Sequence, residues 1–413
     1  MAAIRFDPAH LADVLPPGGL TLVSSCSAES GILADAVMAA GDALGAMTFS
    51  GIFVPGLNRR TWLANPECRV LTFFMTPELK SVGEQVEFIP ICYQDILRLY
   101  RARKPNAALF MCSPPDENGN CSFGSEVAFI ADLWRDIPVR IAHINPLMPR
   151  TSGDAGIPFA EISAYFEASQ PLLGTPVGAF DPVADAIAAH IVPYIRNGAT
   201  LQTGLGKIPD AVMRGLTGHN DLRVHTGLMG DGLLDLVASG AMADGPSALV
   251  GVAIGSAALY AGIADPAFQF RPTSVTHGPS VHAAIDNLVT INSAIEVDLF
   301  GQAYAELTPK GLMSGPGGAS DFARGARYGD GLRIIALPAS AAGGNISRIV
   351  AMGEGAGPVS LGRMDIDIVA TEHGAADLRD KSYSARAEAL IGVASPVHRD
   401  LLWDKWREYA NKL

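Results

Sequence analysis

The sequence predicts an α/β protein in which helices pack closely on parallel sheets. The chain of 413 residues is 48% hydrophobic but only 7% aromatic, and it contains 44 glycines. This composition is typical of parallel strands buried under helices. Short apolar runs bounded by turn residues also alternate with helical patterns along the chain. At ~100–200 residues per domain, the length favours two or three domains.

The first part of the chain alternates strand and helix patterns. Helices are predicted over Ala28–Leu44 and Tyr93–Arg103. Strands are predicted at four apolar runs, which span 20–24, 69–74, 107–112 and 138–144. This alternation favours a parallel sheet, because a crossover helix must return the chain before the next parallel strand.

A second set of elements begins near residue 190. An alanine-rich helix is predicted over Pro182–Tyr194, a strand-like run ends at Gln202, and another helix is predicted over Ala375–Leu390. Further strands are predicted at 248–254, 294–300, 333–337 and 366–370. The Gly- and Pro-containing segment 174–182 is predicted to be a linker, so we place two α/β domains at 1–185 and 186–413.

Charge and cysteine usage narrow the possible partners and compartment. The net charge is −12 and no basic stripe occurs, so nucleic acid is not an expected partner. The five cysteines include no C-x-x-C pair, which argues against structural zinc and favours reduced thiols in the cytoplasm. A signal peptide and an 18-residue apolar stretch are both missing, so no membrane partner is expected. No metal is expected. Four histidines show no metal-ligand spacing, and most of them are interpreted as structural: His143, His277, His282 and His373.

Two glycine-rich loops could bind an anion. The first is L-Q-T-G-L-G-K-I-P-D-A-V at 201–212, where a strand-like run meets a helix start containing Pro209. Backbone N–H groups of such a loop can face an anion or a developing oxyanion. It lacks the G-K-[ST] ending of a phosphate-binding P-loop and the third glycine of G-x-G-x-x-G. The alternative is a tight turn between strand and helix.

The second loop is M-S-G-P-G-G-A-S-D-F at 313–322. Its glycines Gly315, Gly317 and Gly318 would let the backbone approach a ligand closely. A surface turn is the alternative interpretation.

A third stretch, V-H-T-G-L-M-G-D-G at 224–232, contains His225 and Gly227. Histidine is a titratable side chain suited to acid–base chemistry, but for His225 a hydrogen-bonded structural residue is the favoured interpretation, and Gly227 could supply a positive φ angle. Glu296 and Asp298 lie two apart in S-A-I-E-V-D-L-F, on one face of a strand, where they are either solvent-facing or functional.

The N-terminal region offers two weaker candidates. Cys26 in S-S-C-S-A-E-S at 24–30 could be an activated thiol at a helix start, although a buried small residue is the favoured interpretation. Arg59 and Arg60 could pair with a substrate carboxylate, but a solvated surface pair is favoured.

Several segments, taken in order, resemble one family. They are C-S-P-P-D-E-N-G-N-C-S-F-G at 112–124, I-N-P-L-M-P-R-T-S-G at 144–153, the three glycine-containing stretches above, I-N-S-A-I-E-V-D-L-F-G-Q at 291–302, I-I-A-L-P-A-S at 334–340, N-I-S-R-I-V at 345–350 and D-I-D-I-V-A-T-E-H-G-A-A-D-L-R-D-K-S at 365–382. Together they resemble the acetyl-CoA hydrolase/transferase family, which includes 4-hydroxybutyrate and acetate CoA-transferases. The resemblance runs from about residue 110 to the C-terminus and is much weaker before it.

The resemblance implies two similar α/β domains with the active site in the cleft between them, and a homodimer. It implies coenzyme A as the substrate thioester and ping-pong acyl transfer, in which a glutamate attacks the thioester and then carries CoA. The oxyanion would be met by preorganised donors, which the resemblance assigns to Gln202, Gly204 and Gly206 and to Gly315, Gly317 and Gly318.

The sequence departs from the family at the nucleophile. The family pattern is H-[ST]-E, whereas this chain has His225, Thr226 and Gly227. Three interpretations follow. The favoured one is acyl-CoA transfer or hydrolysis in which water or a substrate carboxylate attacks directly. In the second, Glu296 replaces the missing carboxylate; in the third, the chain binds CoA without turnover.

Overall fold

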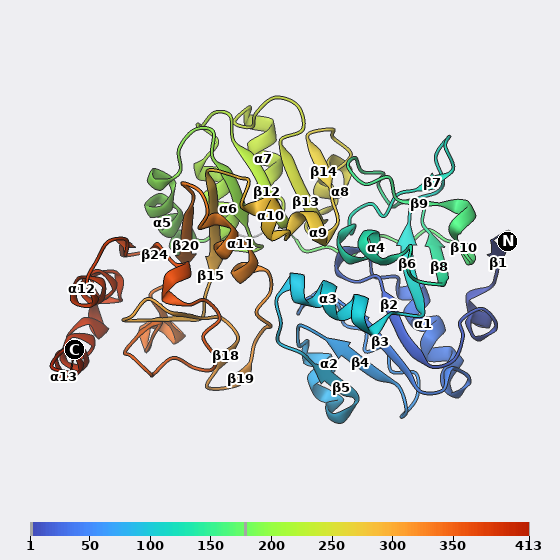
Figure 1. Ribbon diagram of the computed structural model, residues 1–413, viewed down its shortest axis with the longest axis horizontal. Coiled ribbons are helices and arrows are strands. Elements are labelled where there is room, and N and C mark those ends of the chain that lie inside the picture. The colour runs from blue at the N-terminus through green and yellow to red at the C-terminus, as the bar shows by residue number, and fades with distance from the viewer. Residues whose placement is uncertain (1–2, 177–179, 413) are drawn as a thin grey trace. The chain divides into compact units, whose positions relative to one another are not determined.

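Two eight-stranded sheets form the framework of the chain (Figure 1). The computed structural model describes residues 3–176 and 180–412. The first sheet has the order β1-β10-β8-β6-β2-β3-β4-β5, and all its neighbours are parallel. Its strands are β1 (Ile4–Arg5), β2 (Gly19–Val23), β3 (Met47–Gly51), β4 (Arg69–Thr72), β5 (Val86–Phe88), β6 (Ala107–Cys112), β8 (Val139–Ile144) and β10 (Ala164–Glu167).

Two of the α-helices of this first half begin at side-chain caps. The Ser30 hydroxyl accepts a hydrogen bond from Leu33 N at 3.1 Å, and the Thr76 hydroxyl accepts one from Leu79 N at 3.2 Å. Such side chains satisfy amide groups that have no partner within the helix. The helices are α1 (Gly31–Ala40), α2 (Pro77–Ser81), α3 (Tyr93–Arg103) and α4 (Ala128–Leu133), and the short strands β7 (Asn120–Cys121) and β9 (Ile157–Pro158) pair with each other.

The second large sheet has the order β14-β13-β12-β11-β15-β20-β24-β25. Its strands are β11 (Thr200–Thr203), β12 (Arg223–Met229), β13 (Ala248–Ala253), β14 (Phe268–Phe270), β15 (Leu288–Ser293), β20 (Leu332–Ala336), β24 (Ile368–Thr371) and β25 (Gly374–Asp377). β25 runs antiparallel to β24, whereas β11, β15, β20 and β24 run parallel. The strands β12, β13 and β14 are added in turn on one side of β11, and the later strands are added on its other side. The strand order therefore reverses between β11 and β15.

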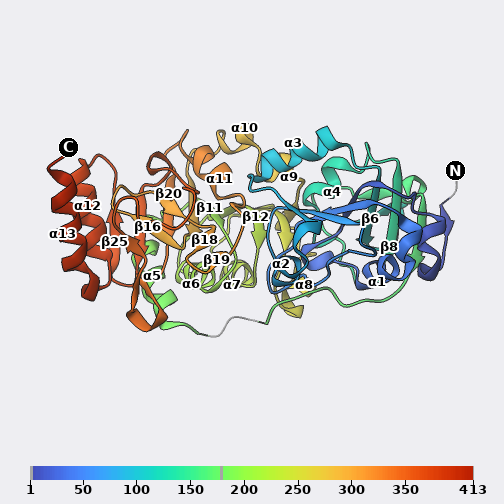
Figure 2. The ribbon, with the colours of Figure 1, turned by 90° about the horizontal axis from the view of Figure 1, so that it is seen from below.

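Helices and small sheets complete this part of the chain. The helices are α5 (Pro182–Ile191), α6 (Lys207–Gly215), α7 (Gly232–Ser239), α8 (Ala257–Gly262), α9 (Thr273–Thr276), α10 (Pro279–His282), α11 (Ala319–Ala326), α12 (Tyr383–Val393) and α13 (Arg399–Ala410). The short strands are β16 (Glu296–Asp298), β17 (Ala303–Tyr304), β18 (Leu307–Thr308), β19 (Gly311–Leu312), β21 (Ser340–Ala341), β22 (Ile346–Ser347) and β23 (Ile349–Val350). Figure 2 shows α12 and α13 side by side, where Leu390 and Trp406 enter one apolar cluster.

The chain divides into two compact units. The first consists of Met1–Val177, Gly227–Met229 and Ala248–Thr276, and the second of Gly178–Thr226, Gly230–Ser247 and His277–Leu413. The predicted domains 1–185 and 186–413 stay a prediction. Residues 177–179 of the predicted linker 174–182 lie outside the described residues.

The α/β fold with parallel sheets is confirmed, but two element predictions were wrong. The helix predicted over Ala375–Leu390 begins only at Tyr383, because 374–377 pairs with β24 and Ser382 caps the helix through Ala385 N. The strand predicted at 294–300 is reduced to β16, which belongs to a three-stranded sheet, while β15 takes the place in the large sheet. The first error arises because an alanine-rich run fits helix and strand equally well. The second concerns the length of the strand and the sheet that it joins, which depend on its partners β17 and β23.

Candidate functional site

A cavity of about 390 Å³ opens at the carboxyl ends of β11, β15 and β20 in the second unit. Leu205 and Gly206 follow β11, Ser293 ends β15, and Pro338 follows β20. The cavity therefore lies where the strand order reverses. In open α/β sheets, this switch point at the carboxyl ends of the strands is the general position for ligands.

The first turn of α6 lines this cavity. Gly206 precedes the helix with φ +122°, and no side chain caps the helix there. Lys207 Nζ donates a hydrogen bond to Asp181 Oδ2 at 2.9 Å. This hydrogen bond, together with backbone donors, lowers the pKa of Asp181. Main-chain N–H groups at an uncapped helix start, with a lysine beside them, favour an anionic ligand.

Gly204 and Gly206 leave their main chain open. A Cβ atom built on either residue would meet no heavy atom within 4 Å. For Gly206 the positive φ explains the glycine, but Gly204 has no such requirement. The space beside Gly204 is therefore available to a ligand rather than filled by packing.

Gln202 lies in β11, one residue before its end, and is buried. Its Nε2 donates to Asn292 Oδ1 at 3.3 Å, and Asn292 Nδ2 donates to Gln202 Oε1 at 2.9 Å. The two amides thus form a reciprocal pair across β11 and β15. A carboxamide has two N–H donors, so the predicted oxyanion role of Gln202 would use the second.

The loop 313–318 precedes α11, whose far end leads into the start of β20. Because β20 is parallel to β15 and β15 to β11, this loop lies at the same carboxyl edge as Gly204 and Gly206. Gly317 adopts φ +61°. A Cβ on Gly318 would lie 2.6 Å from His277 Nε2, so close packing explains this glycine. The predicted donor roles of Gly315, Gly317 and Gly318 stay predictions.

His225 belongs to a buried aromatic cluster. Its ring meets that of His282 edge-to-face at 5.1 Å, and His282 and His277 each pack on Phe322 at 4.7 Å. Burial, followed by the two neighbouring histidines, holds the pKa of His277 well below its usual value. This surrounding favours the structural interpretation of His225, His277 and His282.

Gly227 lies inside β12, where the backbone is extended and suits any residue, so the suggested positive φ was wrong. The preceding residue is fixed, because the Thr226 hydroxyl donates to the Thr203 carbonyl at 2.7 Å. A Cβ on Gly251 would lie 2.8 Å from the Gly227 carbonyl oxygen. Backbone conformation does not demand a glycine at position 227.

The two strand acids have different surroundings. Asp298 is fully buried and accepts hydrogen bonds from Phe300 N, from Gln302 N and Nε2, and from the Tyr304 hydroxyl, at 2.8–3.0 Å. It is therefore a structural anchor for the turn after β16. Glu296 is also buried, and its Oε2 accepts one hydrogen bond from Ala356 N at 2.8 Å.

Sequence reasoning missed an acidic pair in the first unit. Glu126 and Glu29 lie beside the carboxyl ends of β2 and β3, and desolvation raises their pKa values to about 8 and about 7. Burial and Glu126 also raise the pKa of the Cys26 thiol well above its usual value. An activated thiol at Cys26 is therefore contradicted. No spacing rule would have paired Glu126 with this region.

The remaining predicted features are ordinary ones. Arg60 forms an ion pair with Asp35 at the surface, as the favoured interpretation stated. Within 3–176 and 180–412, no group of three His, Cys, Asp or Glu side chains could hold a metal ion. In the same part of the chain, no helix is both long and apolar enough to span a bilayer.

Comparisons with known proteins agree on one family. A family model described as the acetyl-CoA hydrolase/transferase C-terminal domain matches residues 255–406. The 4-hydroxybutyrate coenzyme A transferase of Clostridium kluyveri is 33% identical over 334 residues, which cover 78% of each chain. RipA from Yersinia pestis superposes with a TM-score of 0.92 at 27% identity over 98% of both chains. The 4-hydroxybutyrate CoA-transferase of Porphyromonas gingivalis has a TM-score of 0.82 at 27% identity, again over 98% of both chains.

Proposed function

Because this chain belongs to the acetyl-CoA hydrolase/transferase family, we propose that it acts on the CoA thioester of a small carboxylic acid. The reaction is acyl transfer or hydrolysis, and it proceeds without the glutamyl-CoA intermediate usual for the family. One pair of observations supports the proposal: a cavity lies at the switch point beside the uncapped start of α6, and the residue after Thr226 carries no carboxylate.

The cavity supports stabilisation of a thioester oxyanion. Gly204 and Gly206 leave main chain open beside the uncapped start of α6, whose first N–H groups could meet the oxyanion, while the charge of Lys207 is balanced by Asp181. Preorganised donors of this kind are worth about 3 kcal/mol each in transition-state stabilisation. Hydrolases that have lost their nucleophilic group keep roughly 10³–10⁴-fold catalysis from such donors and from binding.

The attacking group is water or the carboxylate of the acceptor. Attack by water breaks the C–S bond, gives the free acid and releases CoA as its thiol. Attack by an acceptor carboxylate gives a mixed anhydride and CoA thiolate; the thiolate then adds to the second acyl carbon and releases the first acid. Either attack requires the reacting atoms to be held at about 3–3.5 Å.

Two other functions remain as alternatives. Glu296 could act as the nucleophile in ordinary ping-pong transfer, but its hydrogen bond with Ala356 N supports a positioning role in its own loop. A CoA-binding protein without turnover is the other alternative. A glycine at position 227, where the backbone does not require one, is compatible with a protein that binds CoA and has lost the nucleophile.

The test follows free thiol and isotope exchange in the same preparation. Purified protein is incubated with acetyl-CoA, with and without labelled acetate. Thiol release without an acceptor supports hydrolysis, and label entering acetyl-CoA supports transfer. Binding of CoA with neither reaction identifies a binding protein, and a glutamyl-CoA thioester on Glu296, found by peptide mass spectrometry, contradicts the proposal.

We further propose a cytoplasmic homodimer, which the family resemblance and the five free cysteines support. Light scattering coupled to size exclusion would measure the oligomeric state.

A further inference from the structure

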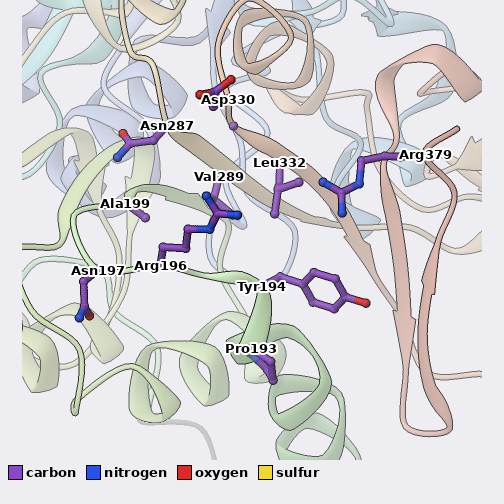
Figure 3. A pocket seen from close by; sticks show the side chains of 11 residues that line it. Pro193, Tyr194, Arg196, Asn197, Ala199, Asn287, Val289, Asp330, Leu332 and Arg379 are labelled. Atoms are coloured by element: carbon purple, nitrogen blue, oxygen red, sulfur yellow. The ribbon is translucent and has the colours of Figure 1, made fainter.

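A second and larger cavity, of about 660 Å³, lies at the opposite edge of the same sheet (Figure 3). Its lining residues come just before or at the start of strands: Ala199 before β11, Asn287 before β15, and Gly331 before β20. This cavity is at the amino ends of the strands, whereas the proposed acyl-CoA site is at their carboxyl ends. Strands of four to six residues separate the two by roughly 13–20 Å.

Arg196 brings an uncompensated positive charge to this cavity. Its side chain lines the wall, and its guanidinium forms no ion pair or hydrogen bond with any residue in the described ranges. An arginine guanidinium stays charged at all relevant pH values and presents a planar set of donors that matches carboxylate or phosphate oxygens.

Arg379 approaches from the other side and is held in place. Asp377 accepts hydrogen bonds from its Nε at 3.0 Å and its Nη2 at 2.6 Å. The guanidinium is thereby oriented, while Nη1 is not used in this pair. Figure 3 shows Arg196 and Arg379 on opposite sides of Leu332, with the phenol of Tyr194 beside them.

The rest of the lining selects size and shape. Val289 and Leu332 supply apolar surface to the cavity wall, and Figure 3 shows Leu332 between the two arginines. Asn287 is fixed, because its Nδ2 donates to the Gly198 carbonyl at 2.5 Å and its Oδ1 accepts from the Thr200 hydroxyl at 3.3 Å. Asp330 also lines the cavity and disfavours a ligand that carries negative charge at every end.

We propose that this cavity binds a small organic anion, in which a carboxylate or phosphate group is held between Arg196 and Nη1 of Arg379 and a short aliphatic body rests on Val289 and Leu332. The site is separate from the acyl-CoA cavity and does not depend on the proposed reaction. Carboxylates and phosphates share this chemistry, so the experiment must distinguish the two sources.

The test measures binding by calorimetry on the full chain with butyrate and with glycerol phosphate as probes. We expect saturable binding of one or both below about 10 mM. Arg196→Gln should weaken it roughly tenfold or more, the size expected for losing a charge-assisted hydrogen bond. Because the Arg196 guanidinium has no partner within the described residues, this variant should keep the wild-type melting temperature.

Two further variants make the outcome decisive. Arg379→Gln should also weaken binding, and Arg324→Gln, which removes an exposed arginine of the same unit outside the cavity, should not. The proposal is overturned if neither probe binds saturably, or if Arg196→Gln and Arg324→Gln bind alike. It is also overturned if CoA displaces the probe and Gly204→Ala abolishes its binding, because the anion then occupies the carboxyl-edge cavity.

Discussion

The carboxylate of Glu126 accepts two hydrogen bonds from a single residue, Ser25: one from its amide N–H at 2.8 Å and one from its hydroxyl at 2.7 Å. The same hydroxyl accepts a hydrogen bond from Ile52 N at 2.9 Å. Glu126 thus joins the ends of β2 and β3. Desolvation of the carboxyl group nevertheless outweighs these donors and raises its pKa to about 8.

This pair predicts how the stability of the chain depends on pH. An acid whose pKa is higher in the folded state favours folding while it is protonated, so its contribution is full below the unfolded value and is lost as pH rises toward about 8. Part of Glu126 remains exposed, so we expect a loss on the order of 2–4 kcal/mol between pH 5 and 9. Urea unfolding at several pH values would measure it.

Glu126→Gln should flatten this pH dependence, because a neutral amide of the same shape can still accept the Ser25 N–H hydrogen bond. Some slope should remain, since the pKa of Glu29 is raised to about 7. Glu87→Gln is the matched control: the hydrogen bonds from Arg103 lower the pKa of Glu87, so its contribution appears only on acidification. Equal slopes in wild type and Glu126→Gln would contradict the assignment.

The sequence predicted an element correctly where its hydrophobic pattern fitted only a helix or only a strand. The helix predicted at Tyr93–Arg103 has those bounds, because Ile96, Leu97 and Tyr100 recur at helical spacing and are buried. The same reasoning failed at Ala375–Leu390, since alanine suits both states and only pairing with β24 decides that 374–377 is extended. Strand assignment there depends on a partner elsewhere in the chain.

The candidate site likewise contains some features that the sequence predicted and others that it could not. The glycine-rich loops could be predicted from the sequence, because glycine readily adopts backbone conformations that other residues avoid. Gly206 does adopt a positive φ. Pairs such as Gln202 with Asn292 were not visible, because they lie 90 residues apart and meet only in the assembled sheet. Ser25 and Glu126 are 101 residues apart and were missed for the same reason.

Gly204→Ala tests whether the open space at the switch point is a binding site. The new methyl group meets no atom within 4 Å and the φ angle is not positive, so we expect an unchanged fold. The methyl would occupy the space beside the loop and keep the reacting carbonyl from the N–H donors, so kcat/KM for acetyl-CoA should fall about tenfold or more, because such donors act on the transition state. Gly218→Ala, which is equally open, should change neither property. Unaltered kinetics in Gly204→Ala would remove this loop from the site.

Gly318→Ala should instead lower stability. The added Cβ would lie 2.6 Å from His277 Nε2 within the buried cluster around Phe322. Overpacking of this kind costs about 1–3 kcal/mol, which a shift of the urea midpoint would show. If stability is unchanged and only acyl-CoA binding falls, Gly318 is a ligand contact and not a packing position.

Glu296→Gln separates a nucleophile from a positioning residue. The amide oxygen of glutamine can still accept the hydrogen bond from Ala356 N, so the loop should keep its geometry. We expect turnover within about threefold of wild type, because no interaction of the transition state is removed. Loss of all acyl exchange in a folded variant would show that Glu296 carries the acyl group.

Gly227→Glu restores the carboxylate that the family places after the histidine and threonine. Position 227 lies in an extended strand whose backbone conformation does not require glycine, and Thr226 is anchored through the Thr203 carbonyl. A glutamate there would supply the nucleophile that the family uses, so label exchange between acetate and acetyl-CoA should rise well above wild type. Borohydride added during turnover should reduce a glutamyl-CoA thioester at this residue to the side-chain alcohol and release CoA thiol, a change that peptide mass spectrometry detects. Gly227→Gln is the matched variant, because it has the same size without a nucleophile and should show no exchange above that of the wild type. If both variants fold and neither gains exchange, the cavity at the carboxyl edge no longer places a thioester within reach of position 227.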